Sequence, residues 1–190
     1  MRAALFVVAL AACGGAKATT GGGGGGGGGD GVAAFETVRA VLQHPRCQNC
    51  HPAGDVPLQG DDGKPHDQNI QRGPEGMGMV GAECSTCHGA ANPPASYGGR
   101  IPPGTPKGWK MPPPETPMVF VGVEAGALCE QIKDPARNGG KDMHALREHL
   151  DDPLVLWGWE PGEGRAKVSV PRDEFIQAFE TWAAAGAPCP

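Results

Sequence analysis

The chain has 190 residues, a length that suits one domain or two small ones. Glycine (32) and proline (20) together exceed a quarter of the residues, whereas aromatic residues make up only 5%. Such a composition allows only a thin apolar core, so metals, disulfides or a bulky cofactor are expected to add stability. The formal net charge is −5 and no basic run occurs, which argues against nucleic-acid binding.

The N-terminal residues 1–30 are expected to lie outside the fold. A short positive start precedes the apolar run Ala3–Ala12, which has the length of a signal peptide and is too short to span a bilayer. The run ends in Leu-Ala-Ala-Cys13, a pattern similar to the bacterial lipobox, in which the signal is cut before the cysteine and the cysteine receives lipid. The alternative is an ordinary signal peptide cleaved nearby.

Nine consecutive glycines, Gly21–Gly29, follow Cys13 after a short polar stretch. Glycine loses the most backbone entropy on ordering, so this tract predicts a flexible tether. The expected organisation is therefore a signal peptide at 1–12, a tether at 13–30 and a folded domain at 31–190. The expected location is the periplasmic side of a bacterial membrane, with a lipid anchor.

Four stretches of the folded part have apolar residues at helical spacing. They cover residues 32–44 after a potential Asp30 cap, 123–134, 141–150 and 171–186, the last of which is bounded by Pro171 and Gly186. The connecting segments 52–81 and 92–117 are rich in turn residues and proline, and no strand pattern is sustained. The predicted fold class is mostly α with extensive Gly/Pro-rich loops.

Two short motifs have the same pattern of cysteine and histidine. They are Cys47-Gln48-Asn49-Cys50-His51 and Cys84-Ser85-Thr86-Cys87-His88, called here the first and second motifs. C-x-x-C-H is typical of haem c attachment, because two thiols reach the two vinyl groups of one porphyrin and the adjacent histidine reaches the iron. The sequence therefore predicts two covalently bound haems c with His51 and His88 as proximal ligands, and a small c-type cytochrome whose loops wrap around them.

Other uses of these cysteines are less consistent with the sequence. Two C-x-x-C pairs could hold zinc through four thiolates, but such a site needs no histidine directly after each pair. A thioredoxin-type redox pair would require a βαβ context, which is absent. Export also favours thioether bonds, because paired thiols in an oxidising compartment otherwise tend to form disulfides.

The sixth iron ligands are expected among the remaining histidines and methionines. His44 is too close to Cys47 to reach the opposite face of its own haem, and His144 and His149 point in different directions on the helix predicted at 141–150. His66, in a polar loop, and His149 rank first. Met118 and Met111, on a proline-rich stretch, rank next, and ordinary packing or solvation is the alternative for each. A methionine ligand would raise the reduction potential relative to histidine.

Cys129 and Cys189 remain once Cys13 and the motif cysteines are assigned. A disulfide between them would join the last helix to the helix near residue 130 and contribute roughly 4–5 kcal/mol in the entropic model. Two free thiols are the alternative.

The paired C-x-x-C-H motifs resemble those of dihaem c-type cytochromes. The phrases "LCEQIKDPARNGG", "DDPLVLWGWEPGEGR" and "WAAAGAPCP" also make the C-terminal half resemble a bacterial family labelled isoquinoline 1-oxidoreductase subunit. The resemblance covers roughly residues 35–190. Its label implies partnership with a larger oxidoreductase, a molybdenum hydroxylase, whose chemistry this chain does not carry.

The function expected from these observations is electron transfer between redox partner proteins. No catalytic residue is predicted, because no nucleophile–base pair stands out. A dihaem peroxidase-like enzyme, a haem-bearing subunit of a larger oxidoreductase and a structural or sensory haem module are the alternatives. A peroxidase would need an open iron and a catalytic acid, and such enzymes are generally much longer.

Overall fold

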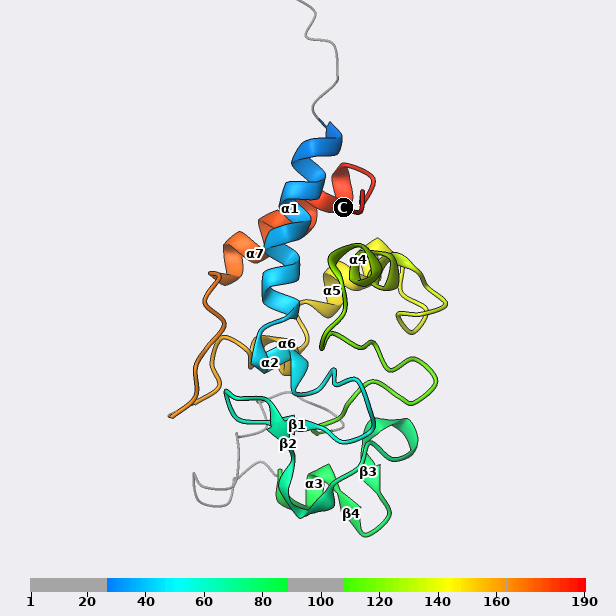
Figure 1. Cartoon of the computed structure of the whole chain (residues 1–190), viewed down its shortest axis with the longest axis vertical. Helices are drawn as coiled ribbons and strands as arrows, with labels where there is room; N and C mark the ends of the chain where they lie inside the picture. Colours follow the sequence, from blue (N-terminus) through cyan, green and yellow to red (C-terminus); the bar gives the residue numbers. More distant parts are fainter. Residues whose placement is uncertain (1–26, 89–107, 163) are drawn as a thin grey trace, which may run out of the picture.

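The computed structural model describes residues 27–88, 108–162 and 164–190. Irregular loops join seven α-helices in these residues, which confirms the mostly α fold class (Figure 1). The helices are α1 (Gly27–Leu42), α2 (Pro45–Gln48), α3 (Cys84–Cys87), α4 (Ala125–Lys133), α5 (Met143–His149), α6 (Pro153–Leu156) and α7 (Arg172–Ala184). The predicted signal peptide, Cys13 and residues 92–107 of the proline-rich stretch lie outside the described residues.

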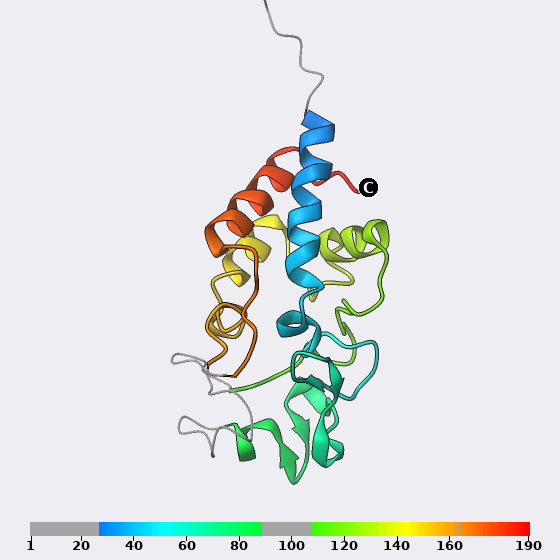
Figure 2. The same ribbon diagram turned by 60° about the vertical axis from the view of Figure 1, so that its left-hand side comes forward.

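Two antiparallel hairpins occupy the polar loop for which no strand was expected. Strands β1 (Leu58–Gln59) and β2 (Lys64–Pro65) pair with each other, as do β3 (Gly78–Met79) and β4 (Ala82–Glu83). A strand of two residues is too short to show the alternation of apolar and polar residues by which strands are recognised in a sequence. Residues 53–88, called here the hairpin lobe, also contain the 3₁₀ turns Asp67–Asn69 and Pro74–Gly76, and end in α3. The second hairpin and α3 lie at the end of the molecule opposite the start of α1 (Figures 1 and 2).

Helix α1 begins at Gly27, three residues before the expected cap at Asp30. Asp30 therefore lies in the first turn, where a carboxylate favours the helix dipole. The glycines at this end permit a close approach to the C-terminal segment. A Cβ added at Gly31 would lie 2.7 Å from the side chains of Ala185 and Pro188.

The core forms mainly between α1 and α7. Phe35, Val38 and Val41 of α1 are buried, and the centroid of the Phe35 ring lies 5.1 Å from that of Trp182. Phe175 and Phe179 complete the buried face of α7. These are the faces predicted from helical spacing. The indole Nε1 of Trp182 donates a hydrogen bond to the carbonyl oxygen of Pro188 at 3.0 Å, which holds the C-terminal segment against the core.

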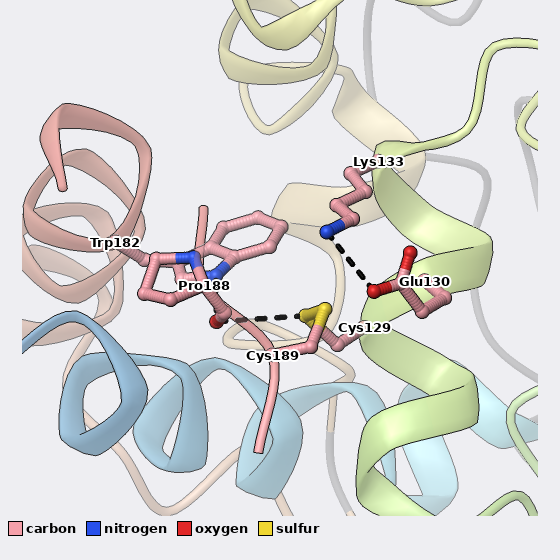
Figure 3. The surroundings of a disulfide bond; sticks show 6 residues. All are labelled: Cys129, Glu130, Lys133, Trp182, Pro188 and Cys189. Carbon is pink, nitrogen blue, oxygen red and sulfur yellow. Dashed lines mark hydrogen bonds and ion pairs between the residues drawn. A yellow bond between two sulfur atoms is a disulfide. The ribbon is translucent and has the colours of Figure 1, made fainter. Parts of the chain in front are cut away.

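The predicted disulfide between Cys129 and Cys189 is present, with 5.6 Å between the two Cα atoms (Figure 3). Helix α7 ends in a left-handed turn at Gly186, where φ is +83°. The amide of Gly186 donates to the carbonyl of Ala183, and that of Ala187 donates to Trp182. This Schellman motif reverses the chain so that Cys189 reaches α4.

No helix within the described ranges is long and apolar enough to cross a membrane.

Candidate haem sites

The first motif lies on a short helix that starts with a cap and a proline. Nδ1 of His44 accepts a hydrogen bond from the amide of Arg46, and Pro45 occupies the first helical position. The turn continues past α2, because the amide of His51 donates to the carbonyl of Cys47 at 3.1 Å. Residues three apart on a helix face the same side, so Cys47 and Cys50 can reach one ligand.

The first motif opens into a cavity of about 500 Å³. This volume lies within the usual range of cofactor pockets, roughly 300–1,000 Å³. Apolar side chains of α1, α5, α6 and α7 line much of it, and Cys47, Cys50 and His51 line the side that carries the motif. The helical body therefore encloses a space beside the two thiols where a large apolar group can bind.

The ring of His51 is held as a metal ligand requires. Its Nδ1 donates a hydrogen bond to the carbonyl oxygen of Met118 at 2.7 Å, which leaves Nε2 as the unprotonated nitrogen. The ring also stacks on Phe120, with 3.9 Å between centroids and 9° between planes. Burial lowers the pKa of His51 to about 4, so the imidazole is neutral at pH 7 and its Nε2 lone pair is available.

The two cysteines of the first motif are thiols and not a disulfide. Burial raises the pKa of Cys47 to about 12 and that of Cys50 to about 11. Both side chains are therefore protonated thiols at pH 7, and both are free for the thioether bonds that haem attachment would form.

Three predicted sixth ligands line the same cavity: His149, Met111 and Met118. The carbonyl oxygen of Met118 contacts Nδ1 of His51, so residue 118 lies on the same side of the expected haem as His51. A sixth ligand must come from the opposite side of the haem, so Met118 is poorly placed to be one. His149 ends α5 at the cavity, where partial desolvation, followed by the charge of Lys141, lowers its pKa although much of the residue still reaches solvent. Met111 is buried.

His144 and His44 are placed elsewhere. The side chain of His144 is 82% exposed and lies 3.7 Å from a carboxylate oxygen of Glu148 on the solvent side of α5. His44 caps α2.

Positive side chains also border the cavity. Lys110, Lys141 and Arg46 are among its lining residues. Two carboxylates, Glu75 and Asp152, also line it. Haem carries two carboxylates, so the three cations among the lining residues could pair with them. Arg46 is buried, and its guanidinium bonds the carbonyl of Gly60 and the carboxylate of Asp61, which ties α2 to the hairpin lobe.

The second motif lies nearer the surface. Cys84 is partly buried and Cys87 is exposed, and both are free thiols on α3. The amide of Cys84 donates to the carbonyl of Met77, and that of His88 donates to the carbonyl of Cys84 at 2.9 Å. The β3–β4 hairpin therefore fixes the start of α3, and one helical turn again carries both cysteines and the histidine.

His66 lies next to the second motif. The centroids of the His66 and His88 rings are 6.2 Å apart and their planes are nearly perpendicular, at 74°. Metal–imidazole bonds are about 2 Å long, so two imidazoles on opposite sides of one ion have ring centres about 6 Å apart. Nδ1 of His66 donates to the carbonyl of Asp67 at 2.8 Å, so Nε2 is the ring nitrogen that this contact does not use. The pair thus has a spacing suitable for the two axial ligands of one iron.

Aromatic rings connect the two motifs. The His88 ring lies 5.0 Å from that of Trp109, which in turn lies 4.8 Å from the ring of Trp157, edge to face. The guanidinium of Arg46, next to Cys47, lies over Trp157 at 5.6 Å. The buried Nε1 of Trp109 has no acceptor among the described residues. An unpaired donor beside His88 fits a bound group that carries carboxylates.

The zinc alternative lacks its geometry. All four motif cysteines lie in the described residues, and in these ranges no three or more histidine, cysteine, aspartate or glutamate side chains are grouped closely enough to hold a metal ion. A zinc site of four thiolates requires such a group.

Sequence reasoning did not identify Phe120, Trp109, Trp157 and Arg46 as parts of these sites. Phe120 and Trp109 contact the motif histidines, and Trp157 contacts Trp109, only through the tertiary fold. The rarity of aromatic residues in this chain was the one available signal that each has a specific place.

Comparisons with known proteins add no assignment: no protein-family model matches the chain, and no curated protein or solved structure matches it significantly.

Proposed function

We propose that this protein is a dihaem c-type cytochrome that carries electrons between redox partners. The observation that carries the proposal is the arrangement of His51: a neutral imidazole, bonded through Nδ1 to Met118 and directed by Phe120, beside two free thiols and a cavity of about 500 Å³. When bound, haem supplies one-electron redox chemistry at its iron.

In this proposal each motif has a separate task. Cys47 and Cys50 hold the first haem inside the helical body, with His51 as proximal ligand and the apolar faces of α1 and α7 excluding water. Cys84 and Cys87 hold the second haem at the surface, with His88 and His66 as its axial pair. Trp109 and Trp157 fill the space between the two sites.

A peroxidase-like enzyme is the second candidate, and the spacing of His66 and His88 disfavours it at the second motif. Two histidines at 6.2 Å leave no open coordination position on an iron between them. The other alternative is a haem-bearing subunit of a larger oxidoreductase, in keeping with the similarity of the C-terminal half to the isoquinoline 1-oxidoreductase subunit family. The chain would then pass electrons for an enzyme without performing catalysis itself.

The test is production of the full chain in a host that exports it and attaches haem c. The intact mass should exceed that of the processed polypeptide by two haems, and the denatured protein should retain peroxidase stain on a gel. The double variant Cys47→Ala/Cys50→Ala should lose one haem, and Cys84→Ala/Cys87→Ala the other. A colourless wild-type protein containing zinc would contradict the proposal.

A further inference from the structure

The end of the molecule that carries the second motif presents an exposed apolar tip. The exposed large hydrophobic side chains among the described residues are Met79 at 48% and Val80 at 93%, and both lie at the turn between β3 and β4. Two adjacent exposed apolar side chains at the end of a hairpin form a small apolar surface that another molecule can cover.

The tip is structurally coupled to the second motif. Gly78 pairs with Glu83 in the hairpin, and the next residue, Cys84, donates its amide hydrogen to the carbonyl of Met77. Strand β4 runs directly into α3, where Cys87 is exposed. A molecule seated on the tip would therefore lie close to the second haem, whereas the first haem lies within the helical body.

The hairpin lobe is acidic. Residues 53–88 contain six acidic and two basic side chains. One of the two bases, Arg72, is buried and forms an ion pair with Asp55. One of the acids lies in the hairpin itself: the Glu83 carboxylate accepts a hydrogen bond from the amide of Gly81 at 3.1 Å. Glu75, in the preceding turn, is exposed but lines the cavity of the first motif. The apolar tip therefore has one carboxylate beside it within an acidic lobe.

We propose that the β3–β4 tip is the docking surface for a redox partner protein whose own haem or metal edge is surrounded by lysine and arginine. This inference rests on the proposed function. Electron-transfer complexes use small interfaces, below about 1,200 Å², so a short apolar contact within an acidic lobe is sufficient. The charges guide the encounter and Met79 and Val80 provide the dry contact.

The step itself is a one-electron exchange. With haem bound at Cys84, Cys87 and His88, the reduced protein would give one electron to an oxidised partner metal, and no atom or proton would be transferred. The tip lies at the end of the molecule opposite the start of α1 (Figure 1).

The experiment uses the full dihaem protein and a small lysine-rich cytochrome c as the probe. Two variants alter the surface: Met79→Ser/Val80→Ser removes the apolar tip, and Glu83→Gln removes the charge beside it. Glu174→Gln is the matched control, because it removes one exposed carboxylate from the first turn of α7. Equilibrium binding is measured with both proteins ferric, by broadening of the probe's NMR signals, and the electron-transfer rate constant by stopped flow.

Both tip variants should weaken binding and lower the second-order rate constant by roughly tenfold at low ionic strength. The effect of the charge variant should disappear at high salt, whereas that of the apolar variant should persist. The α7 control should change neither quantity by more than a small factor.

Tip variants that match the control would overturn the inference. So would a shift of the haem spectrum or potential in Met79→Ser/Val80→Ser, because it would show that these side chains contact the haem instead. If the tip variants carry haem and bind the partner as the wild type does, only the docking surface is contradicted. If the wild-type protein is colourless, the proposed function is contradicted as well.

Discussion

The rings of His66 and His88 lie 6.2 Å apart and at 74° to each other, although the two residues are on different elements of the hairpin lobe. The backbone fixes both of them. The amide of His66 donates to the carbonyl of Pro57 at 2.9 Å, and that of His88 donates to the carbonyl of Cys84. The spacing of the two imidazoles is therefore set by the fold of the lobe.

The first prediction is bis-histidine ligation of the second haem. His66→Ala should leave its iron five-coordinate, so that the reduced protein binds carbon monoxide at one haem and the wild type binds it poorly. The near-perpendicular planes should also give the ferric wild type a strongly anisotropic low-spin signal in electron paramagnetic resonance. His144→Ala is the control, since its ring is exposed on α5. Wild-type spectra in His66→Ala would contradict this ligation.

The second prediction concerns the disulfide. Cys129→Ser/Cys189→Ser should lower the free energy of unfolding by about 4 kcal/mol, since the bond joins residues 60 apart and the entropic model scales with that separation. Denaturant unfolding of the haem-loaded protein measures the change. The spectra of both haems should remain as in the wild type. Recovery of both cysteines as free thiols from native protein would show that the bond does not form.

Local patterns in the sequence predicted the parts of the fold that depend on neighbouring residues. The apolar faces of α1 and α7 follow helical spacing, and the disulfide followed from assigning the other cysteines. The early start of α1 was not predictable from propensity, because glycine is a poor helix former. Among the first residues of α1, Gly31 packs against Ala185 and Pro188, a contact that local sequence does not reveal.

The features that make the motifs into sites are long-range. The hydrogen bond from His51 to Met118 joins residues 67 apart in the sequence. The sequence suggested that the sulfur of Met118 binds iron, whereas in the structure its backbone carbonyl contacts the first motif. The two hairpins that form the lobe have ladders of two residues, which leave no periodic signal.

The third prediction concerns the close contact between Gly76 and Met111, a residue that lines the cavity. Gly76 has a φ of +78°, and a Cβ there would lie 2.0 Å from the carbonyl oxygen of Met111. Gly76→Ala should destabilise the protein by about 3 kcal/mol and disturb the first haem's spectrum. The control Gly140→Ala has a similar φ, +81°, with nothing within 4 Å, so it should show only the smaller cost of backbone strain. Thermal unfolding compares the two, and equal losses would exclude the clash with Met111 as the cause.

The fourth prediction concerns the anchor. Cys13→Ala should move the protein from the membrane fraction to the soluble periplasmic fraction, because each buried methylene of a lipid chain contributes about 0.8 kcal/mol to anchoring. Cell fractionation followed by haem staining measures the distribution. A variant that stays with the membrane would show that the lipobox interpretation of residues 10–13 is wrong.

The last prediction is the sixth ligand of the first haem, which we expect to be His149. It lines the cavity, and burial lowers its pKa, so that the imidazole is neutral and can bind a metal. Met118 is disfavoured because its carbonyl holds the proximal ring of His51. Met111 is buried at the same cavity and is the competing ligand.

Three single variants separate these ligands. His149→Ala should produce a five-coordinate first haem that binds carbon monoxide, whereas Met111→Leu and Met118→Leu should keep the wild-type spectrum. The ferric wild type should also lack the weak sulfur-to-iron band at the red end of the spectrum, since no thioether would be bound. Presence of that band, together with its loss in Met111→Leu and its retention in His149→Ala, would assign the position to Met111. The reduction potential of the first haem would then be higher than histidine ligation gives.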